Sequence, residues 1–331
     1  MARGRAQGPR LPGVVKIGIA ITRARSIDAT WTTVHLARAA LERGATVRFI
    51  EPWDFEVDRR GRVLARTHAF DQPTDAETIA ASLSERTAER RYADVGRLDL
   101  LLLRAAPLDP AIFAFAELAK ERGVRVVNDP AGMLRVTHKA WLASLPGVRV
   151  PPAVVTRSRS SAQVFYASQP TGVVVKPARG SGGKAVGRVV PRRRAELERA
   201  FDEAAAHGDG YVVVQRYLPE AEEGEKRLVW LDGVAVGGYL RVRAPGEFRH
   251  NLKRGATAES TEITATDHAL VEGLSGHLLR AGIRLAGLDI IGGWLIEVNV
   301  LNPGGAYHTD RLSGTQLADQ ILTRLIRPLG A

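Results

Sequence analysis

The sequence predicts an α/β protein in which an N-terminal open α/β domain precedes a second domain built from two parts. In roughly the first 130 residues, short apolar segments alternate with helical patterns, as expected for a sheet with helices packed on it. Further along the chain, short β-type segments dominate and fewer helices separate them. With 331 residues and 45% hydrophobic content, the chain is long enough for two or three packed units.

The N-terminal domain is expected to open with a strand–helix–strand unit. Residues 14–21 form a β-type segment, residues 31–43 have a helical pattern that ends at Gly44, and residues 46–51 form a second β-type segment. The other expected elements are a hairpin over 55–66 that turns at Arg60-Gly61, a buried parallel strand over 98–103, a helix that starts after Asp109-Pro110 and ends at Gly123, and a strand over 124–127.

The second domain is expected to consist mainly of strands. Its first part contains short helical pieces over 133–145, strands over 153–156, 172–176 and 185–190, and a charged helix over 194–206. Its second part contains strands over 211–216, 226–231 and 235–242, a long helix over 267–281, a hairpin over 287–300 and a terminal helix. We therefore expect domains over 14–130, 131–210 and 211–331, preceded by a disordered basic tail over 1–13.

The composition excludes several classes of function. The chain has no cysteine, which excludes disulfides, cysteine-ligated zinc, iron–sulfur clusters and thiol catalysis. We find neither a cleavable leader nor an apolar segment of about 20 residues, so we expect a cytoplasmic protein. The 47 Lys and Arg residues exceed the 36 Asp and Glu residues by 11. Because the arginines are scattered, we interpret this charge mainly as a source of solubility that also favours anionic ligands.

A lysine followed by a glycine-rich loop forms the first candidate site. Residues 173–183 have the sequence VVVKPARGSGG, in which Lys176 ends a strand of β-branched residues. A half-buried lysine needs a charge partner, and the glycines let backbone N–H groups approach a phosphate. The segment matches neither a Walker loop nor a Rossmann fingerprint, because Lys184 is followed by Ala185 and a strand follows the loop. We interpret it as a flap over a triphosphate, with an exposed glycine hairpin as the simpler alternative.

The hairpin over 287–300 forms the second candidate site. Glu297 and Asn299 are two residues apart on one strand, so their side chains face the same way. A two-residue turn at Gly292-Gly293 would place Asp289 on the opposite face. A three-residue turn over 292–294 with a glycine bulge would place Asp289 directly opposite Glu297. Such oxygen ligands suit Mg²⁺, whereas the alternative is an edge hairpin with solvated polar residues.

Weaker signals lie between these two sites. Residues 212–219 form a strand that runs into proline, which leaves backbone groups for an adenine edge, although a purely structural role is the simpler interpretation. Four arginines on or near successive strands could grip phosphate or carboxylate, namely Arg227, Arg241, Arg243 and Arg249. The sequence contains no G-x-S-x-G or H-E-x-x-H motif, and its eight histidines lack ligand spacing.

In their order and spacing, these segments resemble the bacterial glutathione synthetases of the ATP-grasp superfamily, from about Val15 to the C-terminus. The matching segments are VVNDPAGMLRVTHKAWLA, VVVKPARGSGGKAVGRV, VVVQRYLPEAEEGEKRLVWLDG, RHNL and GLDIIGGWLIEVNVLNP. The resemblance implies a pre-ATP-grasp domain followed by a two-part ATP-grasp domain whose first part is a lid. It also implies a ligase in which a carboxylate attacks the γ-phosphate of ATP, and an amine then displaces phosphate from the acyl-phosphate. In the family, γ-glutamylcysteine, glycine and ATP give glutathione, ADP and phosphate.

The resemblance also implies roles for individual residues. The nucleotide would be bound by Lys139 and Lys176 at the phosphates, by the loop Gly180, Ser181, Gly182 and Gly183, by Gln215, Arg216, Tyr217 and Leu218 at adenine, and by Glu225 near the ribose. Mg²⁺ would be bound by Asp289, Glu297 and Asn299, with two ions expected and Mn²⁺ as an alternative. Catalysis would use Arg227, Arg249 and Asn251, which would contact the transferred phosphate and its acceptor.

Three segments depart from the family pattern where the acceptor substrate should bind. Residues 104–107 (RAAP) keep an arginine but lack the basic–acidic pair that precedes the proline in the family, residues 253–257 (KRGAT) replace a glycine-rich loop that ends in arginine, and residues 301–305 (LNPGG) replace a Ser-Pro-Thr segment. Two alternatives therefore stay open. One is a related ATP-grasp ligase with another amino-acid or peptide substrate. The other is a catalytically idle protein that binds nucleotides or nucleic acid.

The expected partners are small-molecule acid and amine substrates. We expect no membrane partner and no nucleic acid, whose binding would depend steeply on salt. Members of the family often form tetramers, so a homo-oligomer is a further expectation from the resemblance.

Overall fold

The computed structural model of the chain describes residues 14–107, 109–180 and 182–327, and it divides into two compact units. Unit 1 comprises Met1–Gly132, Gly282–Leu285 and Leu301–Ala331, and unit 2 comprises Met133–Ala281 and Ala286–Val300. The tail predicted over 1–13 and the candidate residue Ser181 lie outside the described residues. The domain boundaries predicted from the sequence stay a prediction, and the structure groups the C-terminal segment with unit 1.

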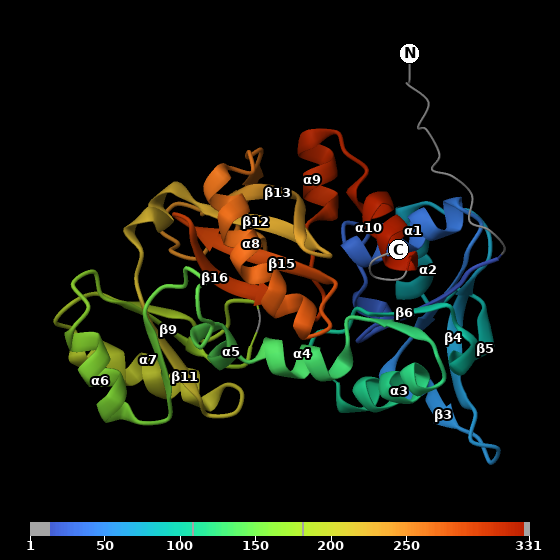
Figure 1. The fold of residues 1–331 in the computed structure, drawn as a ribbon, viewed down its shortest axis with the longest axis horizontal. Coiled ribbons are helices and arrows are strands. Elements are labelled where there is room, and N and C mark those ends of the chain that lie inside the picture. Colours follow the sequence, from blue (N-terminus) through green and yellow to red (C-terminus); the bar gives the residue numbers. More distant parts are fainter. Residues whose placement is uncertain (1–13, 108, 181, 328–331) are drawn as a thin grey trace. The chain divides into compact units, whose positions relative to one another are not determined.

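Unit 1 is built on a seven-stranded sheet in the order β3-β4-β2-β1-β6-β7, with β5 paired to β4 (Figure 1). The strands are β1 (Lys16–Ala20), β2 (Thr46–Ile50), β3 (Phe55–Val57), β4 (Val63–Phe70), β5 (Arg90–Asp94), β6 (Leu100–Leu103) and β7 (Arg125–Val127). The neighbours β2, β1, β6 and β7 are parallel, whereas β4 runs antiparallel to β2, β3 and β5. The predicted open α/β sheet is therefore confirmed.

Helices cover this sheet, with α1 and α10 on one face and α3 on the other (Figure 1). The helices of the unit are α1 (Thr32–Glu42), α2 (Ala76–Ser84), α3 (Pro110–Glu121), α9 (Ala306–Ser313) and α10 (Leu317–Ile326), with 3-10 turns η1 (Ala24–Ser26), η2 (Pro52–Asp54) and η3 (Val95–Arg97). Helix α3 starts as predicted, because Asp109 Oδ1 accepts a hydrogen bond from the Ala111 N–H at 2.8 Å. The single predicted terminal helix is two helices, because Gly314 adopts φ 67° and ends α9.

The centre of the sheet contains a topological switch point. From β1 the chain continues through α1 to β2 on one side, whereas from β6 it continues through α3 to β7 on the other side. The carboxyl ends of β1 and β6 therefore lie next to each other where the strand order reverses. Open α/β sheets bind ligands at such a position.

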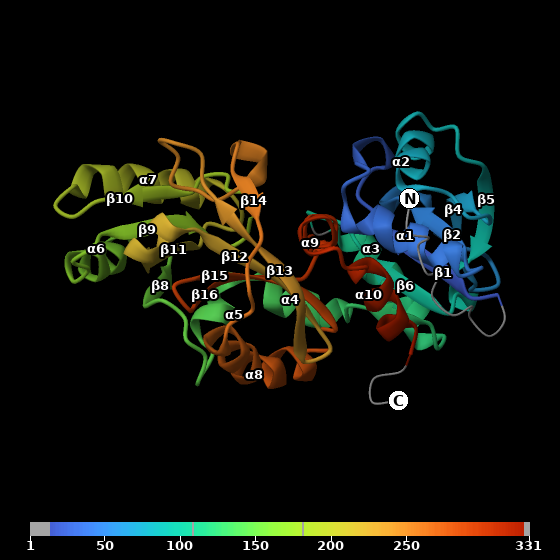
Figure 2. The same ribbon diagram turned by 90° about the horizontal axis from the view of Figure 1, so that it is seen from above.

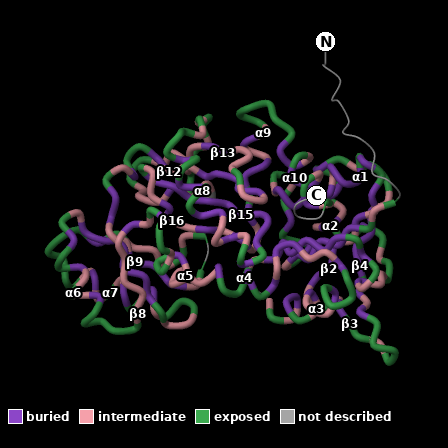
Figure 3. Tube along the Cα trace, viewed as in Figure 1, coloured by how far each residue is buried: buried purple, intermediate pink, exposed green. Residues whose placement is uncertain are grey.

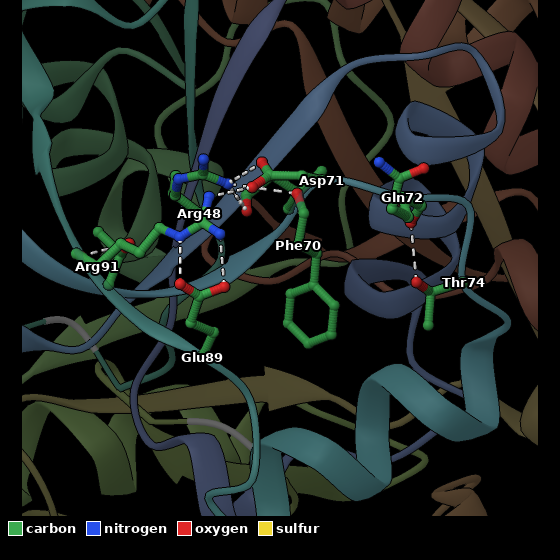
Figure 4. A network of polar contacts seen from close by, with 9 residues as sticks. Arg48, Phe70, Asp71, Gln72, Thr74, Glu89 and Arg91 are labelled. Carbon is green, nitrogen blue, oxygen red and sulfur yellow. Dashed lines mark hydrogen bonds and ion pairs between the residues drawn. The ribbon is translucent and has the colours of Figure 1, made fainter.

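The outer part of the sheet carries a network of ion pairs (Figure 4). Arg48 on β2 pairs with Asp71 at 2.7 Å, and Arg91 on β5 pairs with both Asp71 and Glu89 at 2.5 Å. Ion pairs that are open to solvent contribute little to stability, because water screens them. These arginines are therefore neutralised locally, in keeping with the interpretation of the scattered charge as surface charge.

Unit 2 contains two sheets (Figures 1 and 2). The first has the order β10-β9-β11-β8 and consists of β8 (Ala153–Thr156), β9 (Val173–Pro177), β10 (Gly187–Val189) and β11 (Val212–Arg216). The second has the order β14-β13-β12-β15-β16 and consists of β12 (Glu225–Leu231), β13 (Val234–Val242), β14 (Thr257–Glu259), β15 (Leu285–Ile291) and β16 (Trp294–Asn299). The remaining elements are α5 (Lys139–Ala143), α6 (Arg159–Ala167), α7 (Arg194–Ala206), α8 (Ala265–Arg280), η4 (Pro219–Glu223) and η5 (Leu252–Arg254), while α4 (Pro130–Thr137) contains a unit boundary.

The four-stranded sheet has one apolar face, which α6 and α7 cover. Its core contains Val173, Val175, Val212 and Val214, which alternate along β9 and β11 and are buried together with Phe201 of α7. Figure 3 colours the whole trace by burial. Since side chains alternate between the faces of a strand, Lys176 and Gln215 point to the opposite face of this sheet. No helix in the described part of the chain has both the length and the apolar character that crossing a membrane requires.

Candidate active site

The hairpin of β15 and β16 places Asp289 opposite Glu297. Its turn consists of Gly292 and Gly293, since Ile291 pairs with Trp294, and Ile290 pairs with Leu295. Beyond these pairs Ile296 is an extra residue, and the ladder resumes with Asp289 opposite Glu297 and Gly287 opposite Asn299. From the sequence, a two-residue turn would separate the two acids and a three-residue turn would align them. The structure combines the shorter turn with a bulge in β16, and this bulge restores the alignment.

Asp289 lies at the centre of a buried polar cluster. Its Oδ1 is 2.9 Å from Arg227 Nε and 3.3 Å from Arg241 NH1, and its Oδ2 accepts a hydrogen bond from Asn299 Nδ2 at 2.9 Å. Arg227 lies across Gly287, where a Cβ atom would be only 2.2 Å from Arg227 NH1. The absence of a side chain at residue 287 therefore creates the space in which the Arg227 guanidinium reaches Asp289.

Glu297 faces two lysines. Lys139 Nζ is 3.1 Å from Glu297 Oε1, and it also donates to the carbonyl oxygen of Gly180 at 3.2 Å. Burial acts to raise the pKa of Glu297, but Lys139 and Lys176 outweigh it and hold this pKa below its ordinary value. Glu297 is therefore a carboxylate, and its side chain is 31% exposed, against 6% for Asp289.

Lys176 is buried at the end of β9. Its Nζ donates to Gln215 Oε1 at 3.1 Å and to the carbonyl oxygen of Ile296 at 3.4 Å. Burial lowers the pKa of Lys176 to about 8, because a charged amine is poorly solvated there. The structure thus brings together four of the predicted site residues, namely Lys176, Gln215, Lys139 and Glu297.

Glu225 and Arg241 extend this cluster. The two residues are partners across β12 and β13, and Arg241 NH1 is 2.7 Å from Glu225 Oε1. Burial raises the pKa of Glu225 to about 7, and the negative charge of Asp289 also raises it. The positive charges of Arg241 and Arg227 lower this pKa but do not outweigh the other two effects. In the sequence, Arg241 is one of several scattered arginines, and no pattern assigned it to the site. The pairing of Arg241 with Glu225 could not be read from the sequence, because the register of the β12–β13 hairpin shifts between Val229 and Trp230.

The glycine-rich loop packs against the segment that contains Arg249 and Asn251. Gly182 and Gly183 adopt φ of 73° and 69°, a left-handed conformation that favours glycine. Arg249 NH1 donates to the Gly183 carbonyl at 3.3 Å, and a Cβ on Gly183 would be 3.7 Å from Asn251 Nδ2. Arg249 also binds Glu247, and this hydrogen bond lowers the pKa of Glu247 to about 2. The predicted loop and the predicted catalytic pair Arg249 and Asn251 therefore lie side by side.

The predicted adenine segment is only partly as expected. Its backbone was expected to be unpaired, but the Arg216 N–H donates to Pro152 at 2.9 Å and the Tyr217 N–H donates to Gly172 at 3.0 Å. The Arg216 side chain is bound to Gln169 at 2.9 Å rather than to the other candidate residues. Within the described residues, the Leu218 N–H donates to no backbone carbonyl.

Leu218 belongs to an apolar cluster. It contains the buried side chains of Tyr217, Leu218, Ala221 and Ile291. The guanidinium carbon of Arg188 lies 3.7 Å from the ring centroid of Tyr217, a cation–π arrangement that the sequence analysis missed. No pattern near Arg188 signals this contact, because it depends on how β10 is placed in the sheet.

Two family models match the chain. The model described as prokaryotic glutathione synthetase, N-terminal domain, matches residues 15–135, and the model described as prokaryotic glutathione synthetase, ATP-grasp domain, matches residues 138–314. The chain belongs to the prokaryotic glutathione synthetase family. Both the resemblance seen in the sequence and the predicted ATP-grasp fold are thereby confirmed.

Individual proteins agree with this assignment. The chain is 36% identical over 306 residues to the glutathione synthetase of Prochlorococcus marinus, which covers 88% of this chain and 94% of that protein. It is 33% identical over 209 residues to the glutathione synthetase of Thermosynechococcus vestitus, which covers 63% of this chain and 65% of that protein. Among solved structures, the D-cycloserine synthetase DcsG superposes with a TM-score of 0.67 at 18% identity, over 94% of this chain and 98% of that one, which shows a shared fold.

The donor set of Asp289, Glu297 and Asn299 fits Mg²⁺. Among the described residues no group of three His, Cys, Asp or Glu side chains could hold a metal ion, so a site of carboxylates and histidines alone is not present there. Mg²⁺ commonly takes one or two carboxylates and completes its shell with water and substrate phosphates, and the three residues offer only oxygen ligands to it. Both oxygens of Asp289 are already bound by Arg227, Arg241 and Asn299, whereas Glu297 is more exposed.

Proposed function

We propose that the protein is an ADP-forming ATP-grasp ligase that joins γ-glutamylcysteine to glycine and releases glutathione, ADP and phosphate. One observation carries the proposal. Within unit 2, four basic side chains converge on three side chains that offer oxygen ligands. The basic residues are Lys139, Lys176, Arg227 and Arg241, and the oxygen-bearing residues are Asp289, Glu297 and Asn299. Such an arrangement neutralises phosphate charge and positions oxygens, which is what phosphoryl transfer to a carboxylate requires.

In this proposal, separate groups of residues bind the phosphates, the adenine and the metal ions. Lys139 and Lys176 bind the phosphates of ATP, and the loop with Gly180, Gly182 and Gly183 presents backbone N–H groups to them. The Leu218 N–H binds the adenine edge. Asp289, Glu297 and Asn299 would hold Mg²⁺, with two ions expected and Mn²⁺ as an alternative. Mg²⁺ would neutralise the charge that develops on the phosphate oxygens.

Arg227, Arg249 and Asn251 complete the proposed mechanism. Arg227 Nε lies 2.9 Å from Asp289 Oδ1, and a buried NH1 of Arg227 has no hydrogen-bond partner among the described residues. A buried donor of this kind gains its partner when an anion is present, so Arg227 is proposed to bind the transferred phosphate. Arg249 and Asn251, beside the glycine-rich loop, are proposed to contact the acyl-phosphate.

The test is ADP release by the purified chain with Mg-ATP, a panel of acids, and glycine present or absent. Turnover that requires both γ-glutamylcysteine and glycine, with glutathione as product, is the expected result. ADP release with only another acid–amine pair would replace the substrates and keep the mechanism. ATP binding without turnover for any pair would favour the catalytically idle protein. A homo-oligomer is part of the proposal, and light scattering of the purified chain tests it.

A second candidate is a related ligase with another peptide or amino acid as substrate. The three segments that depart from the family pattern, 104–107, 253–257 and 301–305, favour this candidate. A panel in which a different acid gives the highest kcat/KM would support it.

A further inference from the structure

Strand β5 forms an open edge of the sheet in unit 1. It pairs with β4 and with no other strand in the described part of the chain, and Figures 1 and 2 both show it at the rim of the sheet. Its residues are exposed or partly exposed, and Tyr92 at its centre is 68% exposed. An open edge offers unpaired backbone N–H and C=O groups, so it is a template for pairing with another strand.

The ladder with β4 determines which residues of β5 point outward. The Ala69 N–H donates to the Glu89 carbonyl at 2.8 Å, and Thr67 lies opposite Arg91 in the same ladder. Glu89 and Arg91 therefore direct their backbone groups toward β4, because these groups alternate in direction along an antiparallel strand. The residues whose N–H and C=O groups point away from β4 are Arg90, Tyr92 and Asp94.

The order of charges in β5 fits a second copy of the same strand. If two copies pair antiparallel with Tyr92 opposite Tyr92, Arg90 of each copy lies opposite Asp94 of the other. All three pairs join residues whose backbone groups point outward, so the contact has about six backbone hydrogen bonds. Opposite charges directly across a strand pair stabilise it, and the exposed Tyr92 rings meet at its centre. Within one copy Arg90 also pairs with Asp54 at 2.6 Å and Asp94 with Arg97 at 3.5 Å, so charges of opposite sign alternate across the contact.

Other registers of this pairing fit less well. A contact centred on Arg91 would place the two copies of this arginine directly opposite each other, where like charges destabilise a strand pair. A contact centred on Ala93 would remove Asp94 from its position opposite Arg90. A shift by one residue would set outward-pointing backbone groups against groups that are already bound to β4. The contact centred on Tyr92 is therefore the register that satisfies both the charges and the backbone.

We infer that β5 is a self-association surface, through which two copies of this chain pair antiparallel about a two-fold axis at Tyr92. Because the same strand faces itself, the contact is closed and leaves no β5 edge for a third copy. The inference names the interface of the proposed homo-oligomer, so it rests on that part of the proposed function and not on the reaction. A charged edge that fits its own copy also disfavours pairing with strands of other proteins.

Tyr92→Pro in the full chain tests this edge and leaves the ladder with β4 intact. The Tyr92 N–H points away from β4, and an edge strand tolerates proline at such a position. The dissociation constant of the contact, measured by sedimentation equilibrium, should rise at least about 10-fold, because the central hydrogen bonds are lost. Val57→Pro is the matched control and should associate like wild type. Val57 lies on β3 at another edge of the sheet, and its N–H also points away from β4, since the Asp58 N–H beside it donates to Arg62.

A single introduced cysteine reports the register, because the chain has none of its own. Under mild oxidation Tyr92→Cys should form a disulfide-linked dimer, since the Cα atoms of a hydrogen-bonded antiparallel pair are about 5.5 Å apart, within the range of a disulfide. Val57→Cys, at a position that is 50% exposed on β3, is the control for random collisions and should crosslink at least about 10-fold more slowly. If Tyr92→Pro does not fold, this comparison decides.

The outcomes for the interface and for the proposed reaction can be told apart. Three results overturn the interface even when glutathione is formed: a wild type that is monomeric at every concentration, a folded Tyr92→Pro that associates like wild type, or equal crosslinking of Tyr92→Cys and Val57→Cys. Association that depends on Tyr92 without ADP release from γ-glutamylcysteine and glycine supports the interface and contradicts the proposed reaction.

Discussion

The side-chain nitrogen of Lys176 lies 3.4 Å from the carbonyl oxygen of Ile296, the residue that β16 has in excess of β15. A bulged residue is left out of the strand ladder, so its carbonyl is free to accept another donor. The same bulge aligns Asp289 with Glu297. One extra residue thus orients both the candidate phosphate-binding lysine and the candidate metal ligands.

Nucleotide binding should depend on pH through Lys176. Burial lowers the pKa of this lysine to about 8, with Glu297, Glu225 and Asp289 opposing the effect and Lys139 adding to it. ATP affinity should therefore fall as the pH rises above about 8, by up to about 10-fold per pH unit. Lys176→Arg stays charged and should show a flat profile. Titrations at constant ionic strength measure this, and a flat wild-type profile would contradict the role of Lys176.

The same pKa shift should affect stability in the opposite direction. The folded-state pKa lies below the ordinary value of 10.5, so the unfolded chain binds this proton more tightly. Between about pH 8 and pH 10.5 this lysine alone makes the free energy of unfolding rise with pH. Urea denaturation of wild type and Lys176→Met over this range isolates the contribution as the difference between the two slopes, which should vanish if the shift is absent.

Glu297→Gln keeps the shape of the side chain and removes its charge. We expect Mn²⁺ binding in the presence of an ATP analogue, measured by electron paramagnetic resonance, to weaken strongly. ADP release should fall by at least about 100-fold, because a metal ion supplies several kcal/mol of charge stabilisation. Glu259→Gln, at an exposed position on β14 of the same sheet, is the control and should behave like wild type. Normal Mn²⁺ binding by Glu297→Gln would remove Glu297 from the metal site.

Gly287→Ala should displace the guanidinium of Arg227 and leave the residues proposed to bind the nucleotide unchanged. The added methyl group would meet Arg227 NH1 at 2.2 Å, so the guanidinium must move away from Asp289. ADP release should fall by about 10- to 100-fold, since misplacement by about 1 Å has effects of this size. The overpacking should lower the free energy of unfolding by about 1–3 kcal/mol. Gly276→Ala on α8, where the nearest atom belongs to the flexible end of Arg280, should change neither quantity to this extent.

Gly183→Ala tests the glycine-rich loop, because it strains the backbone at residue 183 without a steric clash. The φ of 69° disfavours alanine by about 1–2 kcal/mol, and the new Cβ would have only ordinary contacts, the nearest at 3.6 Å to Arg249. ATP affinity should therefore fall by about 5- to 30-fold. Gly44→Ala has the same strain at φ 83° in unit 1 and nothing within 4 Å, so it should reduce stability and leave ATP affinity unchanged. Equal ATP affinities for both variants would exclude a role of the Gly183 backbone.

The parts of this protein that sequence reasoning predicts are those governed by neighbours along the chain. The cap at Asp109, the strand–helix–strand unit at the start, and the alternation along β9 that directs Lys176 away from Val175 depend on local pattern alone. These features were sufficient for the fold class and for most of the candidate site.

What the sequence could not show depends on register and on distant contacts. In two hairpins a two-residue turn is followed by a bulge, and the resulting one-residue shift pairs Asp289 with Glu297 and Glu225 with Arg241. If cross-strand pairs are assigned by counting residues outward from the turn, the partners of Asp289 and Glu225 are both wrong by one residue. The contact of Arg104 with Pro303 joins residues 199 positions apart, and no local pattern encodes it.

The packing of α10 on α1 has a consequence for how the protein folds during its synthesis. The apolar residues of α10, Leu317, Ile321, Leu322 and Leu325, are buried, and Arg43 at the end of α1 pairs with Asp319 of α10. A ribosome releases α1 first and α10 only after all of unit 2 has been made. During synthesis, the surface of α1 that α10 will cover stays open to water and to chaperones. The N-terminal sheet can therefore form early, but its core closes only after unit 2 has been synthesised.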